Sequence, residues 1–210
     1  THEALEMVDA ARAAGVKEVW AGNYGALTTA VHDKFDRIFV GYSERELAPY
    51  FGREVKDIIH PPLIEYLNTP FNIKLNVFGV MFTTRGCPVG CNFCQTPVFC
   101  NKPNIIPLKS IERVLAYYKK HNINVVVIED ENFGCNRRHA DQVVELLNRY
   151  EMVWGCMARA DYLRGKIDEW MEMRVTNGRK VSGFGGAAIG IENLHQERLD
   201  AIKKKEGTED

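Results

Sequence analysis

Three cysteines within eight residues restrict this chain more than any other feature. Cys87, Cys91 and Cys94 follow the spacing C-x3-C-x2-C, directly after an apolar run at 77–82. Thiolates are the soft ligands that iron–sulfur clusters and zinc prefer, and three on one tight loop can reach the same metal group. Turn-forming residues stand among them, namely Gly86, Pro88 and Gly90. The segment therefore predicts a loop folded around a metal.

The number of cysteines separates the kinds of metal site. A structural zinc or an electron-carrying cluster usually takes four protein ligands, whereas a catalytic metal keeps one position open. A cubane held by Cys87, Cys91 and Cys94 would leave its fourth iron free for a small molecule. A disulfide framework or a zinc knuckle fits less well, because no paired C-x2-C follows downstream. A structural metal stays open as the alternative.

Composition excludes some partners. The 210 residues carry a formal net charge of -1, so clustered positive charge for nucleic acid or an anionic membrane is not indicated. The basic run 203–205 is typical of a solvated helix end. The sequence shows neither a secretory leader nor the ~18 consecutive apolar residues of a membrane span. With thiols suited to a reducing compartment, we expect a cytoplasmic protein, and the start at Thr1 suggests a fragment of a longer chain.

The region from residue 72 onward repeats apolar runs and amphipathic segments. Expected strands lie at 75–82, 124–128, 152–157 and 187–191, and expected helices at 110–121, 138–150, 166–173 and from 193 onward. Ser110 is the expected N-cap of the first helix, and Asn193 with Gln196 resembles a capping box. Four βα units predict a parallel sheet with right-handed crossovers. Functional groups then gather at the carboxyl ends of the strands.

The first part of the chain has its own α/β pattern. We expect a helix that starts near Thr1 and ends just before Gly15, short strands at 17–21 and 36–40, and glycine turns at 22–25 and 41–44. Ligands of such sheets sit at the carboxyl ends of strands, so these turns are candidate cofactor contacts, although plain tight turns explain them as well. Residues 49–71 begin with Pro49, contain three further prolines at 61, 62 and 70, and predict an irregular connection. The expected domains are 1–71 and 72–210, with the boundary near Asn72.

With Phe93 before the last cysteine, the loop C-x3-C-x-aromatic-C resembles that of the radical SAM superfamily. The resemblance implies the first four strands of a partial (β/α)6 barrel. It also implies a 4Fe-4S cluster on Cys87, Cys91 and Cys94 that cleaves S-adenosylmethionine reductively to a 5′-deoxyadenosyl radical. A small-molecule substrate and an electron donor such as a flavodoxin or ferredoxin would be the partners. The competing hypothesis is a non-catalytic iron–sulfur or zinc protein.

The same resemblance assigns roles to residues at the strand ends. Asp130 or Glu131 would face the amino group of S-adenosylmethionine, and Arg159 its carboxylate. Glu192 would face the ribose hydroxyls, and Phe93 would lie near the adenine. From the residues alone, the acidic side chains are equally well explained as helix caps or solvated groups. A solvated or capping role explains Arg159 less well, because this residue directly follows a buried strand.

The stretch G-N-Y-G followed by F-D-x-I-F-V-G-Y-S-E-x-E resembles the C-terminal part of the Rossmann-like cobalamin-binding domain that precedes many radical SAM cores. The D-x-H-x-x-G motif of that domain is absent from this sequence, so bound cobalamin stays open; if present, it implies methyl transfer. Three further cysteines remain. Cys156 fits a buried apolar role, whereas Cys100 and Cys135 follow strand ends where they could approach the cluster.

Overall fold

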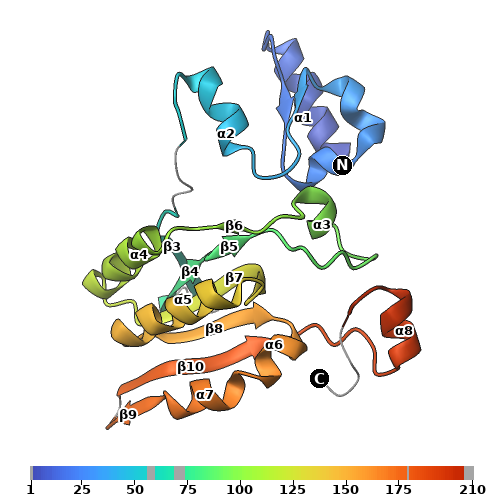
Figure 1. Cartoon of the computed structure of the whole chain (residues 1–210). Helices are drawn as coiled ribbons and strands as arrows, with labels where there is room; N and C mark the ends of the chain where they lie inside the picture. Colours follow the sequence, from blue (N-terminus) through green and yellow to red (C-terminus); the bar gives the residue numbers. More distant parts are fainter. Residues whose placement is uncertain (1, 56–59, 69–73, 179, 206–210) are drawn as a thin grey trace.

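A computed structural model describes residues 2–55, 60–68, 74–178 and 180–205 (Figure 1). Its main sheet has the strand order β3-β4-β7-β8-β10-β9. Four neighbouring strands run parallel: β4 (Lys74–Met81), β7 (Val125–Phe133), β8 (Val153–Ala158) and β10 (Lys180–Ala188). The predicted parallel sheet of four βα units is therefore confirmed. Strand β7 runs further than expected and takes in the acidic residues that follow Ile128.

Helices follow each parallel strand. After β4 and the cysteine loop comes α4 (Leu108–Lys120), and α5 (Arg137–Arg149) follows β7. Two short helices follow β8, α6 (Ala160–Arg164) and α7 (Ile167–Glu172), and α8 (Gln196–Ala201) follows β10. In Figure 1, α8 lies beyond the carboxyl ends of β8 and β10. Helices α4, α5, α7 and α8 thus fall close to where the sequence predicted them, and α6 is an additional short helix before the expected third one.

Two predicted caps are wrong. Helix α4 begins two residues before Ser110, with Pro107 at its N-cap, and the Ser110 hydroxyl instead accepts the backbone N–H of His60 at 3.1 Å. Helix α8 begins at Gln196 with His195 at its N-cap, because the Asn193 side chain accepts from the His195 N–H at 2.9 Å and forms a turn before the helix. In both places the side chain expected to cap the helix accepts a hydrogen bond from a backbone N–H outside the helix.

The hydrophobic core lies between the parallel strands and the helices. Alternate residues of β7 are buried, and they meet the apolar faces of α4 and α5. A cluster of aromatic side chains fills the part of the core beside β8 and β10. In it, the ring centroid of Trp154 lies 5.0 Å from those of Trp170 and Phe184. Gly79 leaves room for the Tyr118 ring, since a Cβ there would lie 2.4 Å from it. Tight packing therefore fixes the strand ends that carry the site.

Antiparallel strands border the sheet on both sides. Strand β3 (Leu63–Asn68) pairs with β4, and β9 (Val175–Asn177) pairs with β10. The irregular connection predicted over 49–71 is therefore wrong for residues 63–68, which extend the sheet beyond the cysteine strand. Prolines at 61 and 62 precede this strand and do not interrupt it. The predicted boundary near Asn72 falls outside the described residues.

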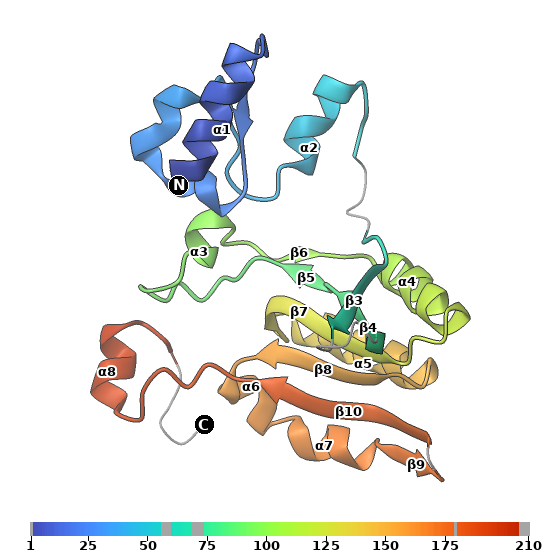
Figure 2. The same cartoon turned by 180° about the vertical axis from the view of Figure 1, so that it is seen from behind.

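The N-terminal part is a small unit above the sheet in Figure 1, and Figure 2 shows the same arrangement from behind. It comprises α1 (His2–Ala13), the parallel pair β1 (Trp20–Ala21) and β2 (Arg37–Ile38), and α2 (Glu44–Leu47). Its 3-10 helices are η1 (Tyr24–Leu27), η2 (Thr29–Lys34) and η3 (Ala48–Phe51). Both strands are shorter than predicted. Across the described parts of the chain, we find no helix long and apolar enough to cross a membrane.

Candidate functional site

The cysteine loop leaves the sheet through a buried anchor. Asp130, near the end of β7, is 0% exposed and accepts four hydrogen bonds. The donors are the backbone N–H groups and the hydroxyls of Thr83 and Thr84. Burial raises the Asp130 pKa to about 6, an effect that these donors limit. The anchor fixes the point where the loop begins, three to four residues before Cys87.

Backbone contacts then shape the loop itself. Gly86 has φ +96°, and a Cβ there would lie 2.8 Å from the Cys100 sulfur and 2.9 Å from the Cys100 carbonyl oxygen. Gly90 also has a positive φ, so both glycines supply the turns that the sequence predicted. The Cys87 N–H donates to the Cys100 carbonyl at 3.1 Å. Around the loop lie β5 (Thr84–Arg85), β6 (Asn104–Ile105) and α3 (Thr96–Phe99).

The loop closes one side of a cavity of about 370 Å³ at the carboxyl ends of the parallel strands. Cys87, Cys91 and Cys94 all line it, as do residues from the ends of β7 and β8, the segment after β10 and the end of the chain beyond α8. The Asn92 N–H donates to the Ile202 carbonyl at 3.0 Å, which ties the loop to α8. Three thiols therefore share one cavity with polar groups from three strand ends.

The three thiols of the cavity form a donor set for a metal group. Among the residues that the structure describes, no three His, Cys, Asp or Glu side chains are grouped as direct ligands of a single ion. A cubane makes a different demand, because each thiolate binds a different iron of the cluster. Three cysteines arranged around one cavity, on a loop tied at both ends, suit a cluster as ligands.

Two cations lie close to the cysteines. Burial raises the pKa of the Cys91 thiol, and the positive charges of Lys204 and Arg159 oppose that rise. Lys204 is 7% exposed, lines the cavity and forms an ion pair with Glu192 at 3.6 Å. The prediction of a solvated helix end for 203–205 is therefore wrong at Lys204. A buried cation beside thiolates favours their charged, metal-binding form.

The structure brings together most of the predicted site residues. Glu131, Arg159, Glu192 and Phe93 line the same cavity as the cysteines, and the Phe93 ring is 52% exposed. Glu192 lies in the segment after β10, because that strand ends at Ala188 and not beside Glu192 as expected. Asp130 does not line the cavity, since its carboxylate turns to the two threonines. Of the two acidic residues expected to face the amino group, only Glu131 lines the cavity.

Arg159 is engaged by the chain itself. Its guanidinium donates to the carbonyls of Lys204 and Lys205 at 2.7 and 2.8 Å and pairs with Asp161 at 3.2 Å. These contacts hold the segment after α8 against the end of β8. Arg159 therefore serves as a wall of the cavity and at the same time as the link between two strand-end segments.

Sequence reasoning did not single out two polar residues of the cavity, Asn132 and Lys204. The Asn132 amide donates to the Cys87 sulfur at 3.8 Å, and its side chain is buried. Alternation along β7 indicates that Asn132 is enclosed like Asp130, but it does not indicate that Asn132 lines the cavity together with Glu131. No sequence signal distinguished Lys204 from its two lysine neighbours.

The remaining cysteines do not line this cavity. Cys156 is buried in β8, where burial raises its pKa to about 12. The Cys100 thiol donates to the Lys102 carbonyl at 3.2 Å. The Cys135 sulfur lies 3.8 Å from the Thr84 hydroxyl, and burial raises its pKa. Cys100 and Cys135 thus contact residues next to the cysteine loop, whereas Cys156 belongs to the hydrophobic core.

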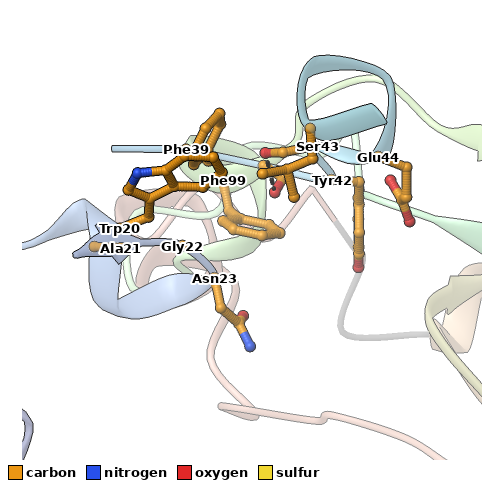
Figure 3. Close-up of a pocket in the computed structure, with 11 residues that line it drawn as sticks. Trp20, Ala21, Gly22, Asn23, Phe39, Tyr42, Ser43, Glu44 and Phe99 are labelled. Carbon is orange, nitrogen blue, oxygen red and sulfur yellow. Dashed lines mark hydrogen bonds between the residues drawn. The ribbon is translucent and has the colours of Figure 1, made fainter. Parts of the chain in front are cut away.

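A second cavity, of about 440 Å³, lies at the carboxyl ends of β1 and β2 (Figure 3). Its wall includes both predicted glycine turns, through Gly22, Asn23 and residues 41–44. Phe99 of α3 closes it from the side of the cysteine loop, stacked on Tyr24 with ring centroids 4.3 Å apart. The same segment, 87–99, thus contributes to both cavities.

Comparison with known proteins places these features in a family. The radical SAM superfamily model matches residues 81–210. Two curated relatives come from Chlorobaculum tepidum. Bacteriochlorophyllide d C-8(2)-methyltransferase is 24% identical over 135 residues, which cover 59% of this chain and 28% of the relative. Bacteriochlorophyllide d C-12(1)-methyltransferase is 25% identical over 151 residues, covering 69% and 31%. The chain thus spans about a third or less of these relatives.

Solved structures share the fold across nearly the whole chain. The radical S-adenosylmethionine methyltransferase TsrM from Kitasatospora setae, with tryptophan and an S-adenosylmethionine analogue bound, matches with a TM-score of 0.67 at 16% identity. The match covers 96% of this chain and 46% of TsrM. The cobalamin-dependent enzyme OxsB, with aqua-cobalamin and S-adenosylmethionine bound, gives 0.60 at 14% identity, covering 99% and 36%. By its cysteine loop and by the family match over residues 81–210, this chain belongs to the radical SAM superfamily.

Proposed function

We propose that this chain is the cofactor-binding part of a radical SAM enzyme that transfers methyl groups with the help of cobalamin. In this proposal Cys87, Cys91 and Cys94 hold a 4Fe-4S cluster, and S-adenosylmethionine occupies the rest of their cavity. A reduced cluster, when bound, supplies the electron that breaks a carbon–sulfur bond of the sulfonium to give methionine and a 5′-deoxyadenosyl radical. The observation that carries the proposal is the gathering of all three thiols and four polar strand-end residues around one cavity.

The residues of the cavity supply complementary groups for a zwitterionic nucleoside. Glu131 offers a carboxylate for the amino group, and the buried Asn132 amide lies beside it. Arg159 and Lys204 offer positive charge for the carboxylate, since both act on Cys91 from the same wall. We assign Glu192 to the ribose hydroxyls and Phe93 to the adenine. The protein's part in the reaction is to orient the sulfonium and exclude water.

The second cavity is the proposed corrinoid site. It lies at the carboxyl ends of parallel strands, where α/β folds bind cofactors, and Phe99 connects its wall to the cysteine loop. In this assignment residues 1–71 form the C-terminal part of a Rossmann-like cobalamin-binding domain, and 72–210 form four units of a partial (β/α)6 barrel. The missing D-x-H-x-x-G motif means that this chain supplies no histidine of that motif as a lower ligand to cobalt.

In this proposal the substrate is a small molecule, and residues 1–210 do not determine its chemical class. Both curated relatives are named for a bacteriochlorophyllide, and one structural neighbour holds tryptophan. Because such different molecules go with the same fold, we attribute the shared part to the cofactors. An electron donor such as a flavodoxin or ferredoxin would reduce the cluster.

Anaerobic reconstitution tests the proposal. The loaded protein should bind iron and sulfide, change its cluster EPR signal when S-adenosylmethionine is added, and release 5′-deoxyadenosine or S-adenosylhomocysteine. A shift in visible absorption with hydroxocobalamin would support the corrinoid site. An EPR signal that S-adenosylmethionine leaves unchanged, with no nucleoside product, would favour a passive metalloprotein.

A further inference from the structure

One tyrosine of the N-terminal part reaches past the cysteine loop to the end of the sheet. The Tyr42 hydroxyl donates to Oε1 of Glu131, near the end of β7. Figure 3 shows the Tyr42 hydroxyl pointing away from Ser43. Residues 42 and 131 are far apart in sequence, so this bond joins the two parts of the chain directly.

Glu131 also forms a hydrogen bond with the start of the cysteine loop. Its other oxygen, Oε2, accepts the backbone N–H of Gly86 at 3.0 Å. Gly86 stands directly before Cys87, and its positive φ and close approach to Cys100 leave its peptide little freedom. A carboxylate held between a tyrosine and a backbone amide therefore connects the N-terminal part to the first cysteine.

Neighbouring groups hold Tyr42 in place. The Arg85 guanidinium lies 4.5 Å from the centre of the Tyr42 ring and pairs with Glu44 at 2.6 Å. Phe99 packs edge-on against the ring, with centroids 5.2 Å apart. Burial and the nearby Glu131 charge raise the pKa of the Tyr42 hydroxyl, so it remains a hydrogen-bond donor at neutral pH.

We propose that Tyr42 is a positioning residue for the cysteine loop. By donating to Glu131 it holds that carboxylate against the Gly86 amide, so the N-terminal part of the chain fixes the start of the loop that carries the cysteines. Tyr42 also lines the second cavity. A ligand bound there touches the ring whose hydroxyl holds Glu131, and so the two cavities are physically linked.

Hydrogen–deuterium exchange tests the positioning role without any cofactor. The readout is the exchange of the peptide spanning residues 85–94 in the metal-free protein. Tyr42→Phe keeps the ring and removes the donor, and we expect exchange in this peptide to rise about tenfold, because hydrogen bonds to charged groups are among the stronger ones. Tyr50→Phe is the matched control. The Tyr50 hydroxyl accepts a hydrogen bond from the Arg37 guanidinium at 3.0 Å, and Tyr50 lines neither cavity.

A second variant keeps the test decisive. Glu131→Gln should raise exchange in the same peptide, and adding Tyr42→Phe to it should have little further effect, because both changes break one chain of contacts. Independent, additive effects, or a Tyr42→Phe peptide that exchanges like the Tyr50→Phe control, would overturn the proposal. Circular dichroism of each variant shows whether the fold is retained.

A second arm uses the proposed corrinoid site and rests on that assignment. Hydroxocobalamin should slow exchange of the 85–94 peptide in the parent protein and leave it unchanged in Tyr42→Phe. If hydroxocobalamin produces no absorption change, the corrinoid assignment fails, while the cofactor-free arm still decides the role of Tyr42.

Discussion

The two cavities share the segment 87–99 but are built in different ways. The cysteine cavity lies at the ends of β7, β8 and β10, whose inner residues belong to a continuous buried core. The second cavity rests on two strands of two residues each, and Phe99 closes it from the other part of the molecule. Among the side chains that the structure describes, the buried members of the main hydrophobic core all lie at position 81 or later, and Ile64 packs against them. The first cavity is held by a core, and the second by a few aromatic and polar contacts.

This difference indicates how each cavity responds to change. A site supported by a core keeps its shape until the whole domain unfolds, whereas a site held by surface contacts opens locally at lower cost. The cysteine cavity suits a group that must be held rigidly. The second cavity suits a ligand that itself adds contacts to the N-terminal part.

The largest expected effect concerns the cysteines. Cys91→Ala should abolish cluster assembly, because it removes one of three thiolates around the cavity. Cys156→Ala, which changes a buried thiol of β8 outside the cavity, should retain iron. Iron and sulfide analysis after anaerobic reconstitution measures both. Full iron content in the Cys91 variant would show that the loop is not the cluster site.

The next largest effect is a difference in stability between substitutions in the main core and in the N-terminal part. Trp154→Ala should lower the free energy of unfolding by ~3–5 kcal/mol, because the side chain is fully enclosed among aromatic rings. Phe39→Ala, in the N-terminal part, should leave the main denaturant transition near its original midpoint, because Phe39 is not part of the main core. Equal losses in the two variants would mean that the chain unfolds as one cooperative unit.

The buried anchor of the cysteine loop should give a pH dependence. The folded pKa of Asp130, about 6, lies above its ordinary value of 3.8, so the folded state binds the proton more tightly. Its contribution to stability is therefore greatest below pH ~4 and falls by about 3 kcal/mol as the pH rises past 6. Asp130→Asn should lack this component. Urea unfolding of both proteins from pH 4 to 7 measures it, and parallel curves would contradict it.

The smallest effect should appear where the N-terminal part meets α3. Tyr24→Phe removes the hydrogen bond between its hydroxyl and that of Thr96, 3.2 Å long, and should cost ~1 kcal/mol or less. Stacking on Phe99 is retained in this variant. The loss should appear as faster amide exchange over residues 20–50, with the main unfolding transition unchanged. A large shift of that transition would place this contact within the core.

Periodicity predicted the sheet and its helices well, because buried strands and amphipathic helices have regular patterns of apolar residues in the sequence. It failed at residues 63–68, where an edge strand beside two prolines carries no such pattern. It also failed at the starts of α4 and α8, where the expected cap side chains accept hydrogen bonds from backbone groups outside the helix.

In the site, sequence reasoning found the cysteines, Glu131, Arg159, Glu192 and Phe93 as groups at strand ends. It could not choose between Asp130 and Glu131, because adjacent residues of a strand point to opposite sides and only the packing of Thr83 and Thr84 shows which one is enclosed. Lys204 was missed because its burial depends on how α8 folds back over the cavity.

The amino-acid sequence by itself determined the cysteine spacing, the turns that need glycine, and the alternation of strand and helix, since each depends on residues close together in the chain. Tertiary structure alone decided which polar groups share a cavity with the thiols and that Tyr42 reaches Glu131. Such contacts join residues distant in sequence, and their geometry is set by the packing of whole elements, which no local pattern records.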